Sequence, residues 1–218
     1  MKSNMSDRLN RRQFIGQCAH TVGSMSILGL LLGTYTRQSA STPARAIRPP
    51  GAIAEEDFTG ACVRCGLCVR DCPYDTLKLA EFGSDVATGT PYFIARDIPC
   101  EMCEDIPCVA ACPTDALSKD LTDIRDADMG VAVLTGPDTC YSVTGVAHCR
   151  ACYVACPIRD EAITMEQKRV GNRIYFEPTV HAQHCTGCGK CEQGCVTEEA
   201  SIKVLPRHLA KHDAGRIA

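Results

Sequence analysis

The segment Cys62–Pro73, CVRCGLCVRDCP, decides the kind of fold that this chain adopts. Three cysteines with two residues between neighbours are followed by three residues, a fourth cysteine and a proline. With this spacing, C-x2-C-x2-C-x3-C-P, a tight loop brings three thiolates to one [4Fe–4S] cube, and the fourth thiolate points to the other cluster of a pair. Gly66 follows the second cysteine, where a missing side chain lets the backbone approach the cluster.

Related quartets recur three times along the chain. The second and third widen one gap each, to C-x2-C-x4-C-x3-C-P and C-x8-C-x2-C-x3-C-P. The fourth repeats the first spacing, with Gly189 in the place of Gly66 and Val196 in the place of the proline. Of the 17 cysteines, Cys18 alone is left over. The predicted metal ligands are therefore Cys62, Cys65, Cys68, Cys72, Cys100, Cys103, Cys108, Cys112, Cys140, Cys149, Cys152, Cys156, Cys185, Cys188, Cys191 and Cys195.

Other uses of these cysteines explain the spacing less well. Disulfides would suit an exported chain but do not require repeated C-x3-C-P ends. Structural zinc sites use two C-x2-C pairs, whereas here three close ligands recur with a fourth beyond them. His148 and His184 each precede a predicted ligand, and histidine replaces cysteine in Rieske centres. Since cysteines complete every quartet, we interpret these histidines as surface or neighbouring residues.

The first 46 residues read as an export signal. Arg11 and Arg12 precede Phe14, and a weakly apolar run follows from Cys18 to Gly33. Ala44-Arg45-Ala46 then matches the small-residue pattern of a signal cleavage site. The adjacent arginines resemble the twin-arginine class, which carries folded proteins, and predict a periplasmic location at the outer face of the cytoplasmic membrane. An uncleaved signal that anchors the protein is the alternative. The apolar run is too interrupted for an ordinary membrane span.

The rest of the chain is acidic. Outside residues 1–46 it has 17 basic and 25 acidic residues, a net charge of −8. Nucleic acid is therefore excluded as a partner, because the phosphate backbone requires Lys and Arg. Around the second quartet, Glu101, Glu104 and Asp105 add negative charge. If these residues are not simply solvated, they would lower the reduction potential of a nearby cluster.

Quartets separated by 28, 28 and 29 positions indicate a repeated unit of strand, ligand loop, short helix and strand. Strand-like stretches at 92–95, 131–134 and 174–176 precede three of the quartets. The predicted fold is α+β, with two bacterial dicluster ferredoxin-like domains. Spacing allows consecutive pairing of the quartets, but the first and fourth share a spacing, which favours nesting. We expect a signal at 1–46, a linker at 47–61, an outer domain from 62–90 and 170–205, an inner domain at 91–169 and a polar tail at 206–218.

Longer phrases resemble the NapG/MauM family over nearly the whole chain: Arg48–Ile53, Ala61–Gly66, Pro91–Cys103, Pro178–His181 and Cys185–Cys191. The resemblance implies electron transfer from a membrane quinol dehydrogenase subunit of the NapH type toward periplasmic cytochrome and molybdenum nitrate reductase subunits. Related four-cluster subunits imply nested ligand sets, which carried over here are Cys62, Cys65, Cys68 with Cys195; Cys185, Cys188, Cys191 with Cys72; Cys100, Cys103, Cys108 with Cys156; and Cys140, Cys149, Cys152 with Cys112.

Three classes of function follow from the sequence. The first is an electron carrier with four [4Fe–4S] clusters and no substrate site of its own, serving nitrate reduction or another quinone-linked periplasmic reductase or dehydrogenase. The second is an assembly or scaffold protein whose clusters only hold its shape. The third, an enzyme, has little support, since we find no phosphate-binding Gly-rich loop and no Gly-x-Ser-x-Gly.

Overall fold

The computed structural model describes residues 20, 23–30, 46–171 and 173–214. The chain divides into two compact units, Met1–Pro43 and Ala44–Ala218. In the first unit the described residues are helical. The predicted signal residues Arg11 and Arg12 lie outside the described residues. Within the described part of the chain, none of the helices has the length and apolar character needed to cross a membrane.

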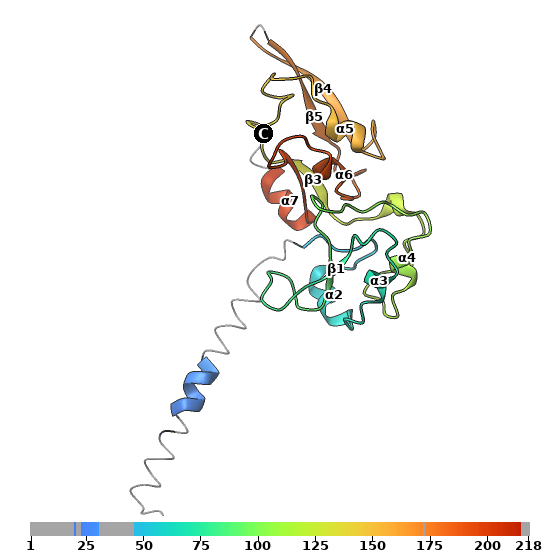
Figure 1. The fold of residues 1–218 in the computed structure, drawn as a ribbon, viewed down its shortest axis with the longest axis vertical. Helices are drawn as coiled ribbons and strands as arrows, with labels where there is room; N and C mark the ends of the chain where they lie inside the picture. The colour runs from blue at the N-terminus through green and yellow to red at the C-terminus, as the bar shows by residue number, and fades with distance from the viewer. Residues whose placement is uncertain (1–19, 21–22, 31–45, 172, 215–218) are drawn as a thin grey trace, which may run out of the picture. The chain divides into compact units, whose positions relative to one another are not determined.

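The second unit is built from two halves that follow one another in sequence, as the colours of Figure 1 show. The first half, residues 46–126, contains α2 (Glu55–Ala61), α3 (Leu67–Arg70), β1 (Lys78–Leu79), β2 (Pro91–Tyr92), α4 (Pro107–Ala110) and the 3-10 helix η1 (Ile124–Asp126). The second half, residues 127–214, contains β3 (Val131–Leu134), α5 (Ala151–Ala155), β4 (Ile163–Val170), β5 (Arg173–Val180), α6 (Lys190–Gln193), β6 (Ile202–Leu205) and α7 (Arg207–Ala214).

Residues 47–61, predicted as a linker, belong to the core of the first half. Ile47 forms a β-bridge with Phe93, and Ala52 forms one with Leu117, so this segment supplies the strand-like stretch that precedes the first quartet. Phe58 of α2 is fully buried. The linker prediction was wrong. It relied on Pro and Gly at 49–51, which are typical of flexible connections, whereas here Gly51 adopts a positive φ of 74° and turns the chain against Ser118.

The second half repeats the plan with longer strands. β3 pairs antiparallel with β6, from Val131 opposite Leu205 to Leu134 opposite Ile202. β4 and β5 form a hairpin of eight residues in each strand, and it projects at the far end of this half in Figure 1. The sequence prediction of a strand at 131–134 is confirmed, while the strand predicted at 174–176 is part of a longer one.

The strand pairing contradicts the nested domain division. Strand β6 was placed in the outer domain and β3 in the inner domain, but the two form one sheet. In the first half, β1 pairs with β2, which follows directly along the chain. The halves are therefore consecutive. Shared spacing of the first and fourth quartets was a poor guide, because spacing sets the loop around the ligands and not the neighbour on which the loop packs.

The predicted polar tail is a helix packed on the second half. Helix α7 contacts β3, and Ala210 is buried. Arg207 donates to the carbonyl oxygens of Ala182 at 3.1 Å and Cys185 at 3.3 Å and forms an ion pair with Asp128. These contacts fasten the loop of the fourth quartet, so the segment is part of the fold up to Ala214 and its last residues, 215–218, lie outside the described chain.

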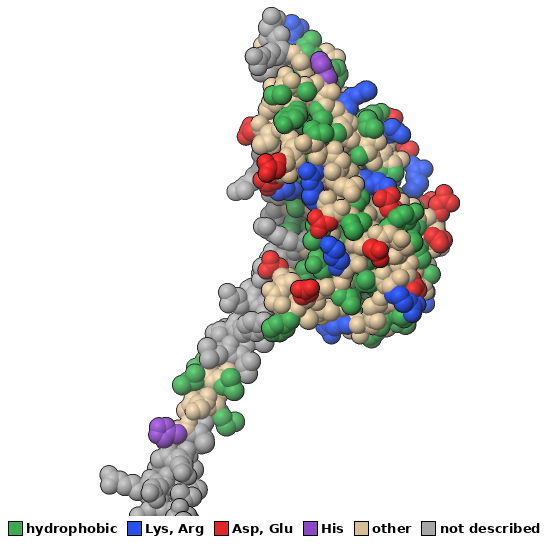
Figure 2. Space-filling view, viewed as in Figure 1, with side chains coloured by type: hydrophobic (Ala, Val, Ile, Leu, Met, Phe, Trp, Pro, Cys, Tyr) green, Lys and Arg blue, Asp and Glu red, His purple; other side chains and the backbone are tan. Residues whose placement is uncertain are grey.

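The core contains few large side chains. Phe58, Phe93, Leu117 and Ile202 are at most 2% exposed, and buried cysteines lie in the same cluster of contacts. On the face drawn in Figure 2, acidic and basic side chains are interspersed with apolar ones. Since thiols occupy much of the interior, the packing of each half depends on what those thiols hold.

Candidate metal centres

The ligand loops share a backbone conformation that sequence reasoning found only in part. Gly66, Ile106 and Gly189 precede α3, α4 and α6 with positive φ angles of 74°, 41° and 89°. A second left-handed position, two residues after the first ligand of its motif, is held by Arg64, Met102 and Gly187 in three motifs. Left-handed backbone is costly for residues with a Cβ, by roughly 1–2 kcal/mol each. The alignment of the quartets could have revealed these positions, because glycine occupies them in one motif or another.

The third motif departs from this pattern. Arg150, which precedes α5, has φ −133° and not a left-handed value. The wide gap between Cys140 and Cys149 is filled by turns, in which Thr144 donates its hydroxyl to the Cys140 carbonyl oxygen at 2.8 Å. Even so, Cys140 lines the same cavity as Cys149 and Cys152. Cys140 therefore lies with this group in spite of the long gap that separates it from Cys149.

All sixteen predicted ligands come together in four groups, each around one cavity. Three members of a group come from one motif, and the fourth is the last cysteine of the neighbouring motif. We name each group after its first motif residue. The Cys62 group is Cys62, Cys65, Cys68 and Cys112; the Cys100 group is Cys100, Cys103, Cys108 and Cys72; the Cys140 group is Cys140, Cys149, Cys152 and Cys195; the Cys185 group is Cys185, Cys188, Cys191 and Cys156.

This grouping corrects all four nested ligand sets. The first motif shares its groups with the second, and the third shares its groups with the fourth. The electrostatic neighbours of the thiols agree: Cys68 interacts with Cys112, and Cys152 interacts with Cys195. The physical reason is that each final cysteine follows a short helix whose direction is set by the adjacent helix, and α3 packs on α4 while α5 packs on α6.

Burial keeps the thiols protonated in the absence of a cation. It raises the pKa of Cys68 and Cys188 to about 11, and the pKa of Cys100, Cys108 and Cys152 to about 12. Neighbouring thiolates of the same group add to the effect, because like charges repel. Four thiolates in one such cavity therefore require a strongly positive partner, and binding it would displace the protons.

Cys195 differs from the other ligands. Burial raises the pKa of its thiol, but hydrogen bonds from the Thr197 hydroxyl and from backbone amides, including those of Ser201 and Ile202, outweigh burial and lower the pKa overall. The Thr197 Oγ1 lies 3.1 Å from the Cys195 Sγ. Such hydrogen bonds stabilise negative charge on sulfur, so they tune the site that contains it.

The cavities suit an iron–sulfur cube better than one ion. Within the described part of the chain, no three Cys, His, Asp or Glu side chains are close enough to share a single metal ion. Each group of four thiols instead lines a separate cavity. One thiolate for each iron of a [4Fe–4S] cube matches this donor set, whereas zinc would need the thiols drawn together around one atom.

The other residues singled out in the sequence lie beside the centres. The His148 ring packs near Phe176, with centroids 6.1 Å apart. Glu101 forms an ion pair with Lys190, so one negative charge of the acidic group is compensated. Burial raises the pKa of Cys103, and the negative charge of Asp105 raises it further; the effect of this loop on a reduction potential stays a prediction.

Comparison with known proteins finds iron–sulfur relatives of both halves. The family model of the 4Fe-4S dicluster domain matches residues 61–116 and 147–198, one match in each half. Over 207 residues the chain is 51% identical to the methylamine utilization ferredoxin-type protein MauM of Methylorubrum extorquens, covering 95% of this chain and 94% of that protein. Over 218 residues it is 50% identical to the ferredoxin-type protein NapG of Escherichia coli, covering 99% and 94%.

The chain belongs to the NapG/MauM family of ferredoxin-type iron–sulfur proteins. A more distant relative is the ferredoxin-type protein NapF of Escherichia coli, at 27% identity over 180 residues. No solved structure matches. Members of this family are iron–sulfur electron carriers, and the four thiol groups described above are the candidate cluster sites of this NapG/MauM protein.

Proposed function

We propose that this protein carries four [4Fe–4S] clusters, one in each cysteine group, and transfers electrons without a substrate site of its own. The observation that carries the proposal is the sorting of all sixteen cysteines into four sets of four around separate cavities. Bound clusters would supply one-electron redox chemistry. The chain contributes the thiolates, the amide and hydroxyl hydrogen bonds to sulfur, and the exclusion of water from the cavities.

The protein acts in the periplasm, at the outer face of the cytoplasmic membrane. The support is the N-terminal sequence, in which Arg11 and Arg12 resemble a twin-arginine signal. Export in the folded state suits a protein whose centres are assembled before transport. Substitution of both arginines by lysine should leave the iron-loaded protein in the cytoplasm, which cell fractionation and immunoblotting would detect. Normal export of that variant would refute this route.

The electron donor is a membrane quinol dehydrogenase subunit of the NapH type, and the acceptors are the cytochrome and molybdenum subunits of periplasmic nitrate reductase. The support is the likeness to NapG along the whole chain. The test is nitrate reduction in a strain that lacks the protein, driven either by quinol in intact cells or by a dye that reduces the terminal enzyme directly. Loss of quinol-driven activity alone supports the path.

A second candidate is electron transfer in methylamine utilization, since the identity to MauM is as high as that to NapG. Growth of the same deletion strain on methylamine distinguishes the two. A growth defect on methylamine with normal quinol-driven nitrate reduction would replace the nitrate assignment by the methylamine one. Normal behaviour in both assays would leave another periplasmic reductase or dehydrogenase as the acceptor.

An assembly role makes a different prediction about the centres. A carrier must be reduced and reoxidised by its partners, whereas a scaffold need only bind iron. Redox titration of the purified protein, followed by electron paramagnetic resonance, tests this directly. Centres that do not cycle within the range of quinol and acceptor potentials would favour the scaffold.

A further inference from the structure

We infer that electrons cross between the two halves at one junction, between the Cys100 group and the Cys185 group, so that the four centres form a single row. This inference rests on the proposed function. The row runs from the Cys62 group through the Cys100 and Cys185 groups to the Cys140 group. Each transfer moves one electron, which oxidises the centre that it leaves and reduces the next. A quinol-derived electron enters one end and leaves from the other.

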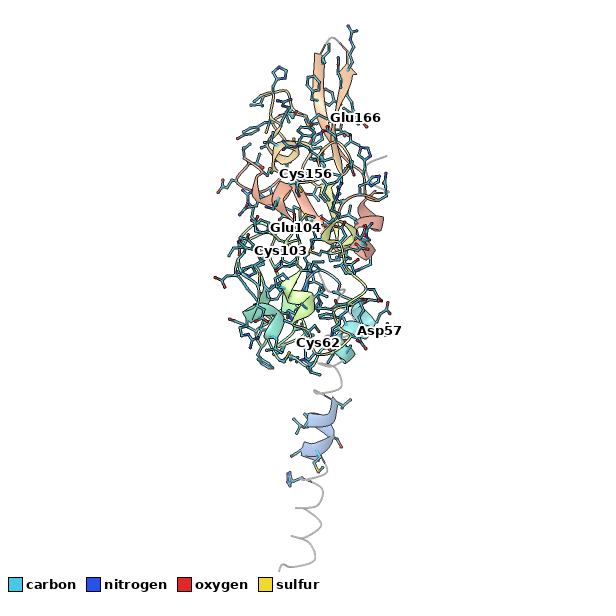
Figure 3. All side chains as sticks on the ribbon, turned by 90° about the vertical axis from the view of Figure 1, so that its right-hand side faces the viewer. Asp57, Cys62, Cys103, Glu104, Cys156 and Glu166 are labelled. Carbon is cyan, nitrogen blue, oxygen red and sulfur yellow. The ribbon has the colours of Figure 1, made fainter. Side chains whose placement is uncertain are left out.

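The ligand loops of the two central groups touch directly. The backbone N–H of Cys100 donates to the carbonyl oxygen of Cys188 at 2.8 Å, and the two thiols interact electrostatically. The Thr186 hydroxyl lies 3.6 Å from Met102 Sδ, which joins the same two loops. Figure 3 shows Cys62, Cys103 and Cys156 in this order along the long direction of the unit. A ligand of one group is thus hydrogen-bonded to a ligand of the other.

Neighbouring groups inside each half are also adjacent. In the first half, α3 carries Cys68 and packs on α4, which carries Cys108. In the second half, α5 carries Cys152 and packs on α6, which carries Cys191. Every neighbouring pair in the row therefore has ligand thiols close enough to influence one another. The Cys62 and Cys140 groups are left at the two ends, and the first of these exposes its Cys65.

The junction is held at close range by Gly189. A Cβ at this position would lie 2.5 Å from the Cβ of Ala95 in the other half and 3.5 Å from the Cβ of Pro99. Ordinary contact begins at about 3.4 Å, so any larger residue must separate the halves by several tenths of an ångström. Gly66 has the same place in the first motif and a similar φ of 74°, but a Cβ there meets only the Leu79 side chain at 3.5 Å.

These two glycines give a matched pair of variants. G189A and G66A impose a similar backbone strain, since both positions are left-handed, but G189A alone drives apart the two halves. After reduction, magnetic interaction between centres falls with the cube of their separation. We expect G189A to weaken the interaction that spans the halves and to slow electron equilibration between them. G66A strains its own ligand loop but should leave the interaction that spans the halves at its wild-type strength, because a Cβ at Gly66 meets no residue of the other half.

Removal of selected cluster sites tests the order of the row without relying on the G189A and G66A variants. A full-length variant with C65A and C149A disables the two end groups and leaves the two central ones. A matching variant with C103A and C188A disables the central groups and leaves the ends. We expect interacting electron paramagnetic resonance signals in the first variant and independent signals in the second, with similar iron content in both.

The outcomes separate the inference from the proposed function. If wild-type protein lacks iron for four centres, the proposed function fails. If the iron complement is full but the variant with C65A and C149A gives independent signals, or the variant with C103A and C188A gives interacting ones, the row is wrong. Equal effects of G189A and G66A on the interaction would likewise overturn the junction at Gly189.

Discussion

Replacement of Arg96 by Met should loosen the attachment of the two halves and accelerate the loss of the centres. Arg96 belongs to the first half and donates to five carbonyl oxygens of the second. The three shortest bonds go to Glu192 at 2.7 Å, Cys195 at 2.8 Å and Thr197 at 2.8 Å, and longer ones go to Gln193 and Glu198. A hydrogen bond from a charged group contributes about 1.5–3 kcal/mol. Since Arg96 is half-exposed and water can replace part of these bonds, we expect about 2–3 kcal/mol in total.

The assay is kinetic, because loss of the clusters makes unfolding irreversible. Visible absorption of the loaded protein would be followed in guanidinium chloride under anaerobic conditions. A barrier lower by 2–3 kcal/mol corresponds to loss that is about 30- to 150-fold faster. The control is R125M, because Arg125 also joins the halves, at 3.0 Å from Glu161, but in an exposed ion pair whose loss costs at most about 1 kcal/mol.

Loss rates of R96M and R125M within about threefold of each other would refute the reasoning, because exposed and half-buried contacts would then contribute alike. A large effect of R96M on its initial iron content would point instead to a failure of assembly. Iron content measured before the kinetic run separates the two results.

Three further predictions follow from the same contacts. R48M should lower the kinetic barrier to cluster loss by about 3 kcal/mol, since Arg48 is buried and its loss leaves the Glu55 carboxylate without its ion-pair partner. A loss rate like that of the wild type would return residues 47–61 to the role of a linker. T197V should lower the reduction potential of the centre in the Cys140 group by about 20–60 mV, because the Thr197 hydroxyl stabilises negative charge on Cys195. Redox titration is the measurement, and T144V is the control, because the Thr144 hydroxyl bonds a carbonyl oxygen and not a sulfur. Removal of iron should unfold most of the chain, which circular dichroism would detect. Any metal-free structure that remains should become less stable as the pH rises from about 9 to 12. The sign follows because burial raises the thiol pKa in the folded chain, so the unfolded chain loses its protons first; stability that rises over this range would contradict it.

The motif spacing was sufficient to predict the ligands as candidates but not their partners. Spacing describes a loop, and three cysteines of each group indeed come from one loop. The fourth cysteine, such as Cys112 or Cys195, depends on which short helices pack together, and nothing in the spacing encodes that contact. The likeness of the first and fourth quartets therefore suggested nesting, whereas the packing of α3 on α4 and of α5 on α6 joins consecutive quartets.

Two segments were misjudged because their composition resembles surface chain. Pro49 and Gly51 look like a linker, yet Pro49 is fully buried and Gly51 turns the chain into a β-bridge. The polar residues after Pro206 form a helix because one apolar position, Ala210, and the contacts of Arg207 fasten it to the second half. In both cases long-range contacts determine the structure, and these contacts cannot be predicted from local composition.

The most direct test of the consecutive grouping is the iron content of two double variants of the full chain. Cys62 and Cys112 share a group, so C62A with C112A should lose no more iron than C62A alone, about one quarter of the total. Cys62 and Cys195 belong to different groups, so C62A with C195A should lose about one half. The reverse result, with the larger loss in C62A with C112A, would contradict the structure and restore the nested arrangement.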